Sequence, residues 1–225
     1  MISINISSLK IGDEDIIFND KAKNLGVFLD KDLTMNFQIT NLSKAIYLEI
    51  RKLKNISKFV SQSCLKTLAA SFILSRLDYC NALYKNLNKY QIDQIQKLQN
   101  FAAKVVLSKS IYEHVTPCLI ELHWLPISFR INYKIAVLTF KCLHGLAPKY
   151  LSDLVEEYHP SRSLRSSSQK LLKKKVVNFE KLGKKSFSFS APDVWNSLPF
   201  HLRNENSIDV FKKKLKTFYF KEAFY

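Results

Sequence analysis

The sequence predicts a mainly α-helical protein with a small antiparallel β piece at its N-terminus, an α+β protein in which helices dominate. This prediction rests on two different periods of the apolar residues along the sequence. Apolar and polar residues alternate within residues 1–33, as in strands, whereas after residue 37 the apolar residues recur three or four positions apart, as on one face of a helix. The 225 residues are 47% hydrophobic, which suffices to bury one moderate core or two small ones.

Residues 1–33 are predicted to form short strands. Isoleucines alternate with polar residues over positions 2–6, a turn signal begins at Gly12, and short apolar runs follow at residues 16–18 and 25–29. Three such strands bury too little to be stable alone. We therefore expect them to pack on the helices that follow or on a sheet that these residues do not supply.

Residues 37–107 are predicted to form a bundle of three helices. The third helix starts at Asn88, where Gln91 three positions on predicts a capping box. The second helix, over residues 63–83, is predicted to bury Leu65, Leu68, Phe72 and Leu77. Basic residues lie largely off the apolar row of the first helix and are candidate phosphate contacts. They are Lys44, Arg51, Lys52, Lys54 and Lys58.

Residues 108–225 are predicted to form a helical and irregular C-terminal region that is basic from about residue 160. Thr116, which precedes a proline, is predicted to cap a short helix ending near Trp124. A longer helix over 127–144 is predicted to end at Gly145. We also expect a short helix within 149–158, a strand at 187–190, where Phe and Ser alternate, and a last helix over 208–221.

The net charge of +16 favours an anionic partner, with nucleic acid first and an anionic membrane surface second. The charge is uneven, because residues 1–33 carry −2 whereas residues 160–221 carry +11. Since phosphate contacts depend on local positive density, the C-terminal segment supplies further candidates. They are Arg162, Arg165, Lys173, Lys174, Lys175, Lys184 and Lys185. The competing interpretation is that the lysines only form a solvated surface.

The four cysteines are expected to be reduced core residues, because no pair has zinc-finger spacing. A Cys2His2 set can be assembled from Cys118, His123, Cys142 and His144, but its spacing fits no known zinc knuckle. We therefore predict no metal ligand and no cofactor. No charged leader with an apolar core opens the sequence and no apolar run reaches membrane-spanning length. A soluble, intracellular protein is expected, in either the nucleus or the cytoplasm.

Six segments in this order resemble the end of the polymerase reading frame of LINE-type, non-LTR retrotransposons of the jockey-like group. They are residues 24–30 (NLGVFLD), 75–81 (SRLDYCN), 122–126 (LHWLP), 147–151 (APKYL), 191–199 (APDVWNSLP) and 211–217 (FKKKLKT). The resemblance implies that residues 1–33 are the last palm strands of a reverse transcriptase, residues 37–107 its thumb and residues 108–225 the region behind the thumb.

The resemblance also implies a nucleic-acid-binding role without catalysis. Leu25, Gly26 and Val27 would form the primer grip, where a glycine lets the backbone approach a nucleic-acid end. The implied partners are RNA or an RNA/DNA hybrid and the missing catalytic part of the polymerase. No paired-aspartate motif is present, and Asp13 and Asp15 belong to a turn. We therefore expect no catalytic residue and no RNA-directed DNA polymerase activity in what reads as a truncated transposable-element enzyme.

Two functions from other classes remain open. A structural or protein-interaction module would explain the helices and leave the lysines solvated. A membrane-surface protein would use the last helix, with lysines on one face and aromatic residues near the other. Trp124 and Trp195 stand next to or near prolines within apolar segments, and they are predicted to be core anchors rather than platforms for base stacking.

Overall fold

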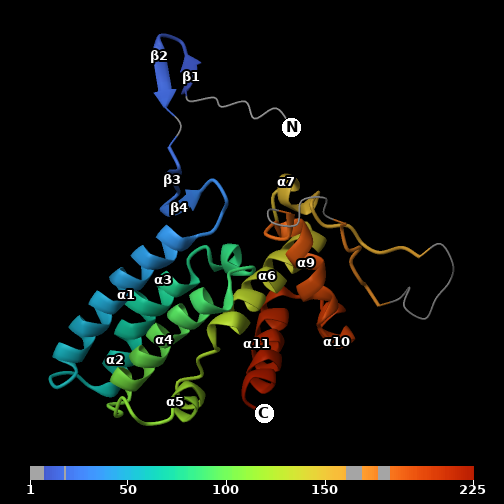
Figure 1. Cartoon of the computed structure of the whole chain (residues 1–225). Coiled ribbons are helices and arrows are strands. Elements are labelled where there is room, and N and C mark those ends of the chain that lie inside the picture. Colours follow the sequence, from blue (N-terminus) through green and yellow to red (C-terminus); the bar gives the residue numbers. More distant parts are fainter. Residues whose placement is uncertain (1–7, 18, 161–168, 177–182) are drawn as a thin grey trace.

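A computed structural model describes residues 8–17, 19–160, 169–176 and 183–225 and has the predicted class, mainly α with a small antiparallel β piece (Figure 1). The expected strand at residues 2–6 and the candidates Arg162 and Arg165 lie outside the described residues. The helices form two neighbouring groups. One is a bundle made by the first half of the chain, and the other is a C-terminal group around α6.

The β piece consists of two hairpins rather than the three strands expected. Strands β1 (Ser8–Ile11) and β2 (Glu14–Ile17) pair antiparallel across the predicted turn at Gly12. Strands β3 (Lys21–Asn24) and β4 (Val27–Asp30) form the second pair. The first hairpin stands away from the helices, whereas the second lies at the start of α1 (Figure 1).

The second hairpin packs on the following helix, which is one of the two outcomes expected from the sequence. Val27 is 3% exposed and belongs to the core. The rings of Phe28 and Phe37 pack in a T-shaped arrangement with their centroids 4.8 Å apart. The Phe28 amide donates to Gln38 Oε1 at 3.0 Å. Strand β4 is therefore anchored to α1 by burial and by a buried polar side chain.

The predicted bundle is present, with a more segmented second helix. It contains α1 (Asn36–Ile56), α2 (Gln62–Ala69), the π-helical turn η1 (Ala70–Leu74), α3 (Ser75–Asp78), the 3₁₀ turn η2 (Asn81–Tyr84) and α4 (Lys89–Val106). The capping box at the start of α4 is confirmed, since Asn88 Oδ1 accepts from the Gln91 amide and Gln91 Oε1 accepts from the Asn88 amide.

The π-helical turn explains why the predicted buried face of the second helix is partly wrong. A π turn takes one residue more than an α turn, so it moves the following side chains round the axis. Leu65 and Leu77 are buried as expected, but Ile73 takes the core position and Phe72 is 51% exposed.

Among the described residues, the C-terminal group contains α5 (Thr116–Glu121), α6 (Ile127–Leu143), α7 (Lys149–Ser152), α9 (Phe187–Asn196), α10 (Phe200–Arg203) and α11 (Ile208–Phe224). Helix α6 ends at Gly145 as predicted, with φ +66 at the glycine and the Leu146 amide bonded to the Lys141 carbonyl. Thr116 is not a cap, because α5 already includes it and Val115 occupies the cap position.

The strand predicted at residues 187–190 is wrong, because these residues begin α9. The alternation of Phe and Ser is only four residues long. Ala191, Val194, Trp195 and Leu198 follow at helical spacing and are all buried. Tertiary packing of that longer apolar row outweighs the short alternation.

One continuous core joins the bundle to the C-terminal group. Trp124 and Trp195 are 7% and 0% exposed, so the prediction that they are core anchors is confirmed. Cys118 and Cys142 are buried, but Cys64 is exposed, so the prediction of four core cysteines is wrong for Cys64. Among the helices of the described residues, none is long and apolar enough to cross a membrane.

Candidate nucleic-acid interface

Four basic side chains form a row along the outer face of α1 and the turn that follows it. Lys44, Arg51, Lys54 and Lys58 are seven, three and four positions apart, which places them on one side of a helix. We call these four residues the α1 row. All four are exposed, and within the part of the chain that the structure describes their side chains have no hydrogen-bond or ion-pair partner. The row therefore presents uncompensated positive charge.

An aromatic side chain lies within this row. Tyr47 follows Lys44 by three positions and precedes Arg51 by four, so it shares their face. Its side chain is 50% exposed and stacks on Phe101 of α4, with ring centroids 6.2 Å apart and an interplanar angle of 29°. An exposed ring held flat by a second ring offers a surface for base stacking. Tyr47 is not among the residues predicted from the sequence, although the same spacing identifies it.

Lys52, predicted with the row, lies elsewhere on the helix. Its Nζ is 3.3 Å from Glu49 Oε1, and the same oxygen is 3.3 Å from Arg76 Nη2 of α3. The Glu49 side chain is only 15% exposed. Lys52 therefore belongs to a small charge cluster between α1 and α3, and the structure brings together four of the five residues proposed for the first helix.

The C-terminal lysines differ from the row because several already have partners. Lys173 Nζ lies 3.0 Å from Glu156 Oε1, and Lys174 Nζ lies 3.1 Å from Asp193 Oδ1. The backbone around them is also fixed, since Asn196 exchanges two hydrogen bonds with Leu172 and Trp195 Nε1 donates to the Lys170 carbonyl. The backbone at Lys170 and Leu172 is therefore held against α9.

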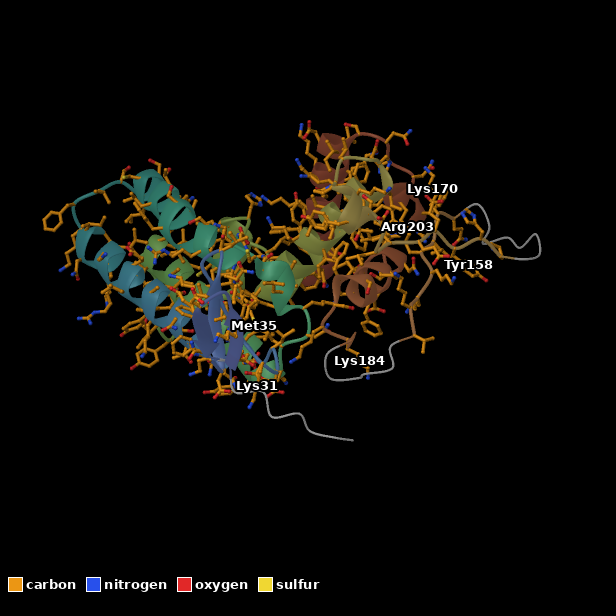
Figure 2. The ribbon with its side chains drawn as sticks, turned by 90° about the horizontal axis from the view of Figure 1, so that it is seen from above. Lys31, Met35, Tyr158, Lys170, Lys184 and Arg203 are labelled. Carbon is orange, nitrogen blue, oxygen red and sulfur yellow. The ribbon has the colours of Figure 1, made fainter. Side chains whose placement is uncertain are left out.

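Part of the C-terminal basic region lies across the molecule from α1. In Figures 1 and 2, which differ by a quarter turn, α1 stays at one side and the chain around Lys170 at the other. Lys170, Tyr158 and the buried Arg203 mark the C-terminal side in Figure 2, whereas Lys184 lies nearer to Lys31 and Met35. A rigid ligand that lies along the α1 row therefore does not reach the segment around Lys170 by the same face.

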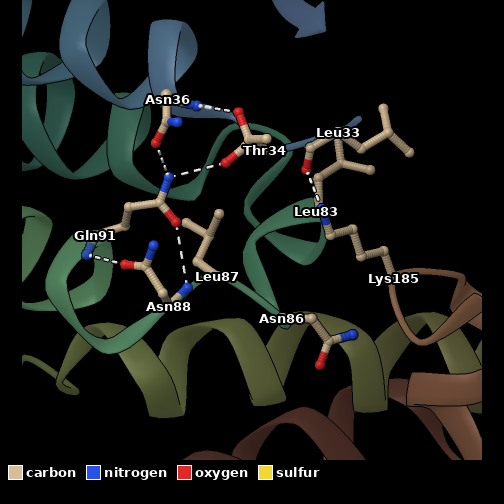
Figure 3. A pocket seen from close by; sticks show the side chains of 9 residues that line it. All are labelled: Leu33, Thr34, Asn36, Leu83, Asn86, Leu87, Asn88, Gln91 and Lys185. Atoms are coloured by element: carbon tan, nitrogen blue, oxygen red, sulfur yellow. Dashed lines mark hydrogen bonds between the residues drawn. The ribbon is translucent and has the colours of Figure 1, made fainter. Parts of the chain in front are cut away.

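Lys185 connects the C-terminal group to the loop before α1. Its Nζ donates to the carbonyls of Asp32 and Leu33, both at 2.8 Å. Figure 3 shows it beside a cavity of about 300 Å³, whose wall also contains Thr34 and Gln91. The neighbouring residue, Lys184, accepts a hydrogen bond from Asn86 through its carbonyl. Lys185 thus holds two segments of the chain together, whether or not it also meets a phosphate.

The turn that resembles a primer grip is partly at the surface. Leu25 is 83% exposed and Gly26 has φ +83, a conformation that favours glycine, whereas the Val27 side chain is inside the core. Tyr79 Oη donates to the Leu25 carbonyl at 2.6 Å. Of the three residues predicted for this site, Leu25 and Gly26 are therefore placed to meet a ligand, and Tyr79 fixes their turn.

Asp30 orders the loop between this hairpin and α1. Its carboxylate accepts from the Thr34 amide at 2.8 Å, the Met35 amide at 2.9 Å and the Thr34 hydroxyl at 3.0 Å. Burial alone would raise the pKa of Asp30, but these hydrogen bonds outweigh it and the net effect lowers the pKa. The loop needs this support, because Leu33 and Met35 have φ +49 and +61.

The described residues contain no group of three or more His, Cys, Asp or Glu side chains that could hold a metal ion. His123 is exposed, has φ +52 and places its ring 5.5 Å from Phe220 of α11. The last helix uses its apolar face internally, since Phe211, Leu215 and Tyr219 are buried. That burial removes much of the face that a membrane-surface protein would insert.

No protein-family model matches the chain, and comparisons with curated proteins and with solved structures find no match either.

Proposed function

We propose that this chain is the nucleic-acid-binding end of a LINE-type reverse transcriptase, comprising the last palm strands, the thumb and the region behind it. On this proposal it binds RNA or an RNA/DNA hybrid mainly through phosphates and has no polymerase activity of its own. The observation that carries the proposal is the α1 row, four exposed and unpaired cations with Tyr47 among them. Such a row follows a phosphate backbone without reading sequence.

The contacts between the resembling segments support the same proposal. Tyr79 from residues 75–81 bonds to Leu25 in residues 24–30. Asp78, from that same segment, pairs with Arg130 of α6 through both carboxylate oxygens. Residues 24–30 and 75–81, which are far apart in the sequence and both part of the resemblance, thus meet in space.

The binding test compares two variants with the same loss of charge. In one, the α1 row is replaced by glutamine (Lys44→Gln, Arg51→Gln, Lys54→Gln, Lys58→Gln). In the control, four exposed lysines elsewhere are replaced (Lys10→Gln, Lys89→Gln, Lys149→Gln, Lys221→Gln). Fluorescence anisotropy with an RNA/DNA hybrid over a salt series should show that only the first variant flattens the slope of log K against log salt, by about 3 to 4.

Three results would contradict the binding proposal. Absence of salt-dependent binding by the unmodified chain would favour a protein-interaction module. Equal effects of the two variants would mean that total charge, rather than the α1 row, attracts the ligand. Flotation with anionic vesicles but no hybrid binding would instead favour the membrane-surface function.

The catalytic part of the proposal has its own test. Two-metal nucleotide transfer requires clustered carboxylates, and the sequence has no paired-aspartate motif. The chain should therefore give no primer extension with Mg²⁺ or Mn²⁺ on an RNA or DNA template. Incorporation that co-purifies with the chain and survives removal of contaminating polymerases would overturn this part. Its partner for synthesis would be the catalytic part of the polymerase.

A further inference from the structure

A cavity of about 400 Å³ lies between the bundle and the C-terminal group. Its wall combines residues of α3, η2, the segment before α6, α6 itself and α11. The volume is in the range of small-molecule sites, which occur preferentially where two structural units meet. None of the residues of the α1 row lines it.

The charge of this wall is positive after its internal pairing. Asp78 is the one carboxylate among the lining residues, and Arg130 neutralises it, with Nε 2.9 Å from Asp78 Oδ1 and a second contact between Nη2 and Oδ2. Lys134 and Lys216 also line the cavity, and among the described residues neither side chain has a hydrogen-bond or ion-pair partner. Two positive charges therefore remain for a ligand.

A buried polar group in the same wall also lacks a partner. Asn81 lines the cavity and is 2% exposed. Its Nδ2 donates to Asp78 Oδ1 at 3.3 Å, but its Oδ1 is buried and has no hydrogen-bond partner. A buried acceptor without a donor costs about 1–3 kcal/mol. A ligand with an N–H group would satisfy it.

Much of the remaining wall is apolar, although His123 and Tyr133 also line it. Leu74, Leu122, Trp124 and Leu125 contribute to it and are each at most 9% exposed. The cavity thus offers an apolar surface, a buried hydrogen-bond acceptor that lacks a donor and two cations, which match a flat ring with an N–H edge joined to a phosphate.

We propose that this cavity holds one unstacked nucleotide, with the phosphate at Lys134 and Lys216 and the base against the apolar wall near Asn81. Every nucleobase has an N–H donor on its edge, so the site would be tolerant of sequence. This inference rests on the proposed function and deepens it, because it adds a second contact for a bound strand beyond the α1 row. It also gives the C-terminal group a role in binding in addition to any contribution of the lysines at 173–185.

The test measures binding of adenosine 5′-monophosphate to the full chain by isothermal titration or by amide chemical shifts. The double variant Lys134→Gln, Lys216→Gln should weaken binding at least about tenfold, because it removes both charge-assisted contacts to the phosphate. The control, Lys141→Gln with Lys213→Gln, changes the same two helices outside the cavity and should leave the affinity unchanged. These lysines lie outside the core, so the fold is retained in both variants.

Competing ligands separate a nucleotide site from an anion site. Adenosine and inorganic phosphate should each bind at least about tenfold more weakly than the nucleotide. Equal binding of inorganic phosphate would overturn the nucleotide assignment, and so would unchanged nucleotide affinity in the Lys134/Lys216 variant or no binding at millimolar concentration. The α1-row variant should lose the hybrid but keep the nucleotide. Failure of this inference is therefore distinguishable from failure of the proposed function.

Discussion

Two basic regions of this molecule have similar sequence character and different structural states. The α1 row is exposed and has no partner within the described residues, whereas Lys173 and Lys174 are matched to Glu156 and Asp193 and Lys185 is bonded to two carbonyls. The lysine-rich stretch at 173–185 thus has fewer available charges than its sequence suggests. Binding to a polyanion depends on cations that release counterions when they meet a phosphate, and a cation already paired contributes less.

The largest expected effect comes from comparing the two regions directly. Replacing Lys173, Lys174, Lys175, Lys184 and Lys185 by glutamine removes five charges, one more than the α1-row variant does. Because most of these lysines have protein partners, the slope of log K against log salt should change by at most about 1 to 2, compared with about 3 to 4 for the α1 row. Anisotropy titrations of both variants measure it. A larger change in the five-lysine variant would make the C-terminal segment the main binding surface.

A smaller effect is expected when C-terminal lysines are released from their partners. Glu156→Gln and Asp193→Asn together leave Lys173 and Lys174 without their carboxylates. Both ion pairs are exposed, so their loss should cost little stability. Hybrid affinity in low salt should rise about three- to tenfold, since two more cations become available. The control, Glu222→Gln with Asp153→Asn, changes the net charge equally at exposed carboxylates. A similar gain in the control would show that only the total charge matters.

The sequence predicted the fold class, the capping box at Asn88, the helix end at Gly145 and the core tryptophans, because each depends on local spacing or on strong apolar character. It did not predict the helix at 187–190 or the exposure of Phe72. Those depend on tertiary packing and on a π-helical turn, which no periodic pattern of the sequence encodes.

Only part of the candidate site could likewise be predicted from the sequence. The α1 row follows from spacing alone, and Lys52 could be separated from it by the same rule. The pairing of Lys173 with Glu156 joins residues 17 positions apart, and that of Lys185 with Asp32 joins residues 153 positions apart. Long-range partners of this kind decide which cations are free, and composition does not reveal them.

A still smaller effect is expected from replacing Lys185, and this effect is on stability rather than on binding. Lys185→Met keeps the aliphatic stem but removes two charge-assisted hydrogen bonds to the loop at 32–33. We expect a loss of about 1–2 kcal/mol and a melting temperature lower by about 2–8 °C. Lys175→Met is the matched control, because its ammonium has no partner among the described residues. Equal melting temperatures for the two variants would show that the Lys185 contacts do not hold the loop.

The smallest effect is a pH dependence at Asp30, which orders the same loop from its other end. The pKa of Asp30 is lower in the folded protein than in the unfolded chain, so its carboxylate stabilises the fold above the unfolded value of about 3.9. That contribution is lost as the pH falls through the lowered, folded value. Asp30→Asn should therefore melt below the unmodified chain at pH 7, and the gap should close as the pH falls below about 4. Thermal melts between pH 7 and pH 3 measure the gap, with Asp93→Asn on the exposed side of α4 as the control for loss of one carboxylate. A gap that stays constant over this range would mean that the side-chain geometry, and not the charge of Asp30, supports the loop that Lys185 holds.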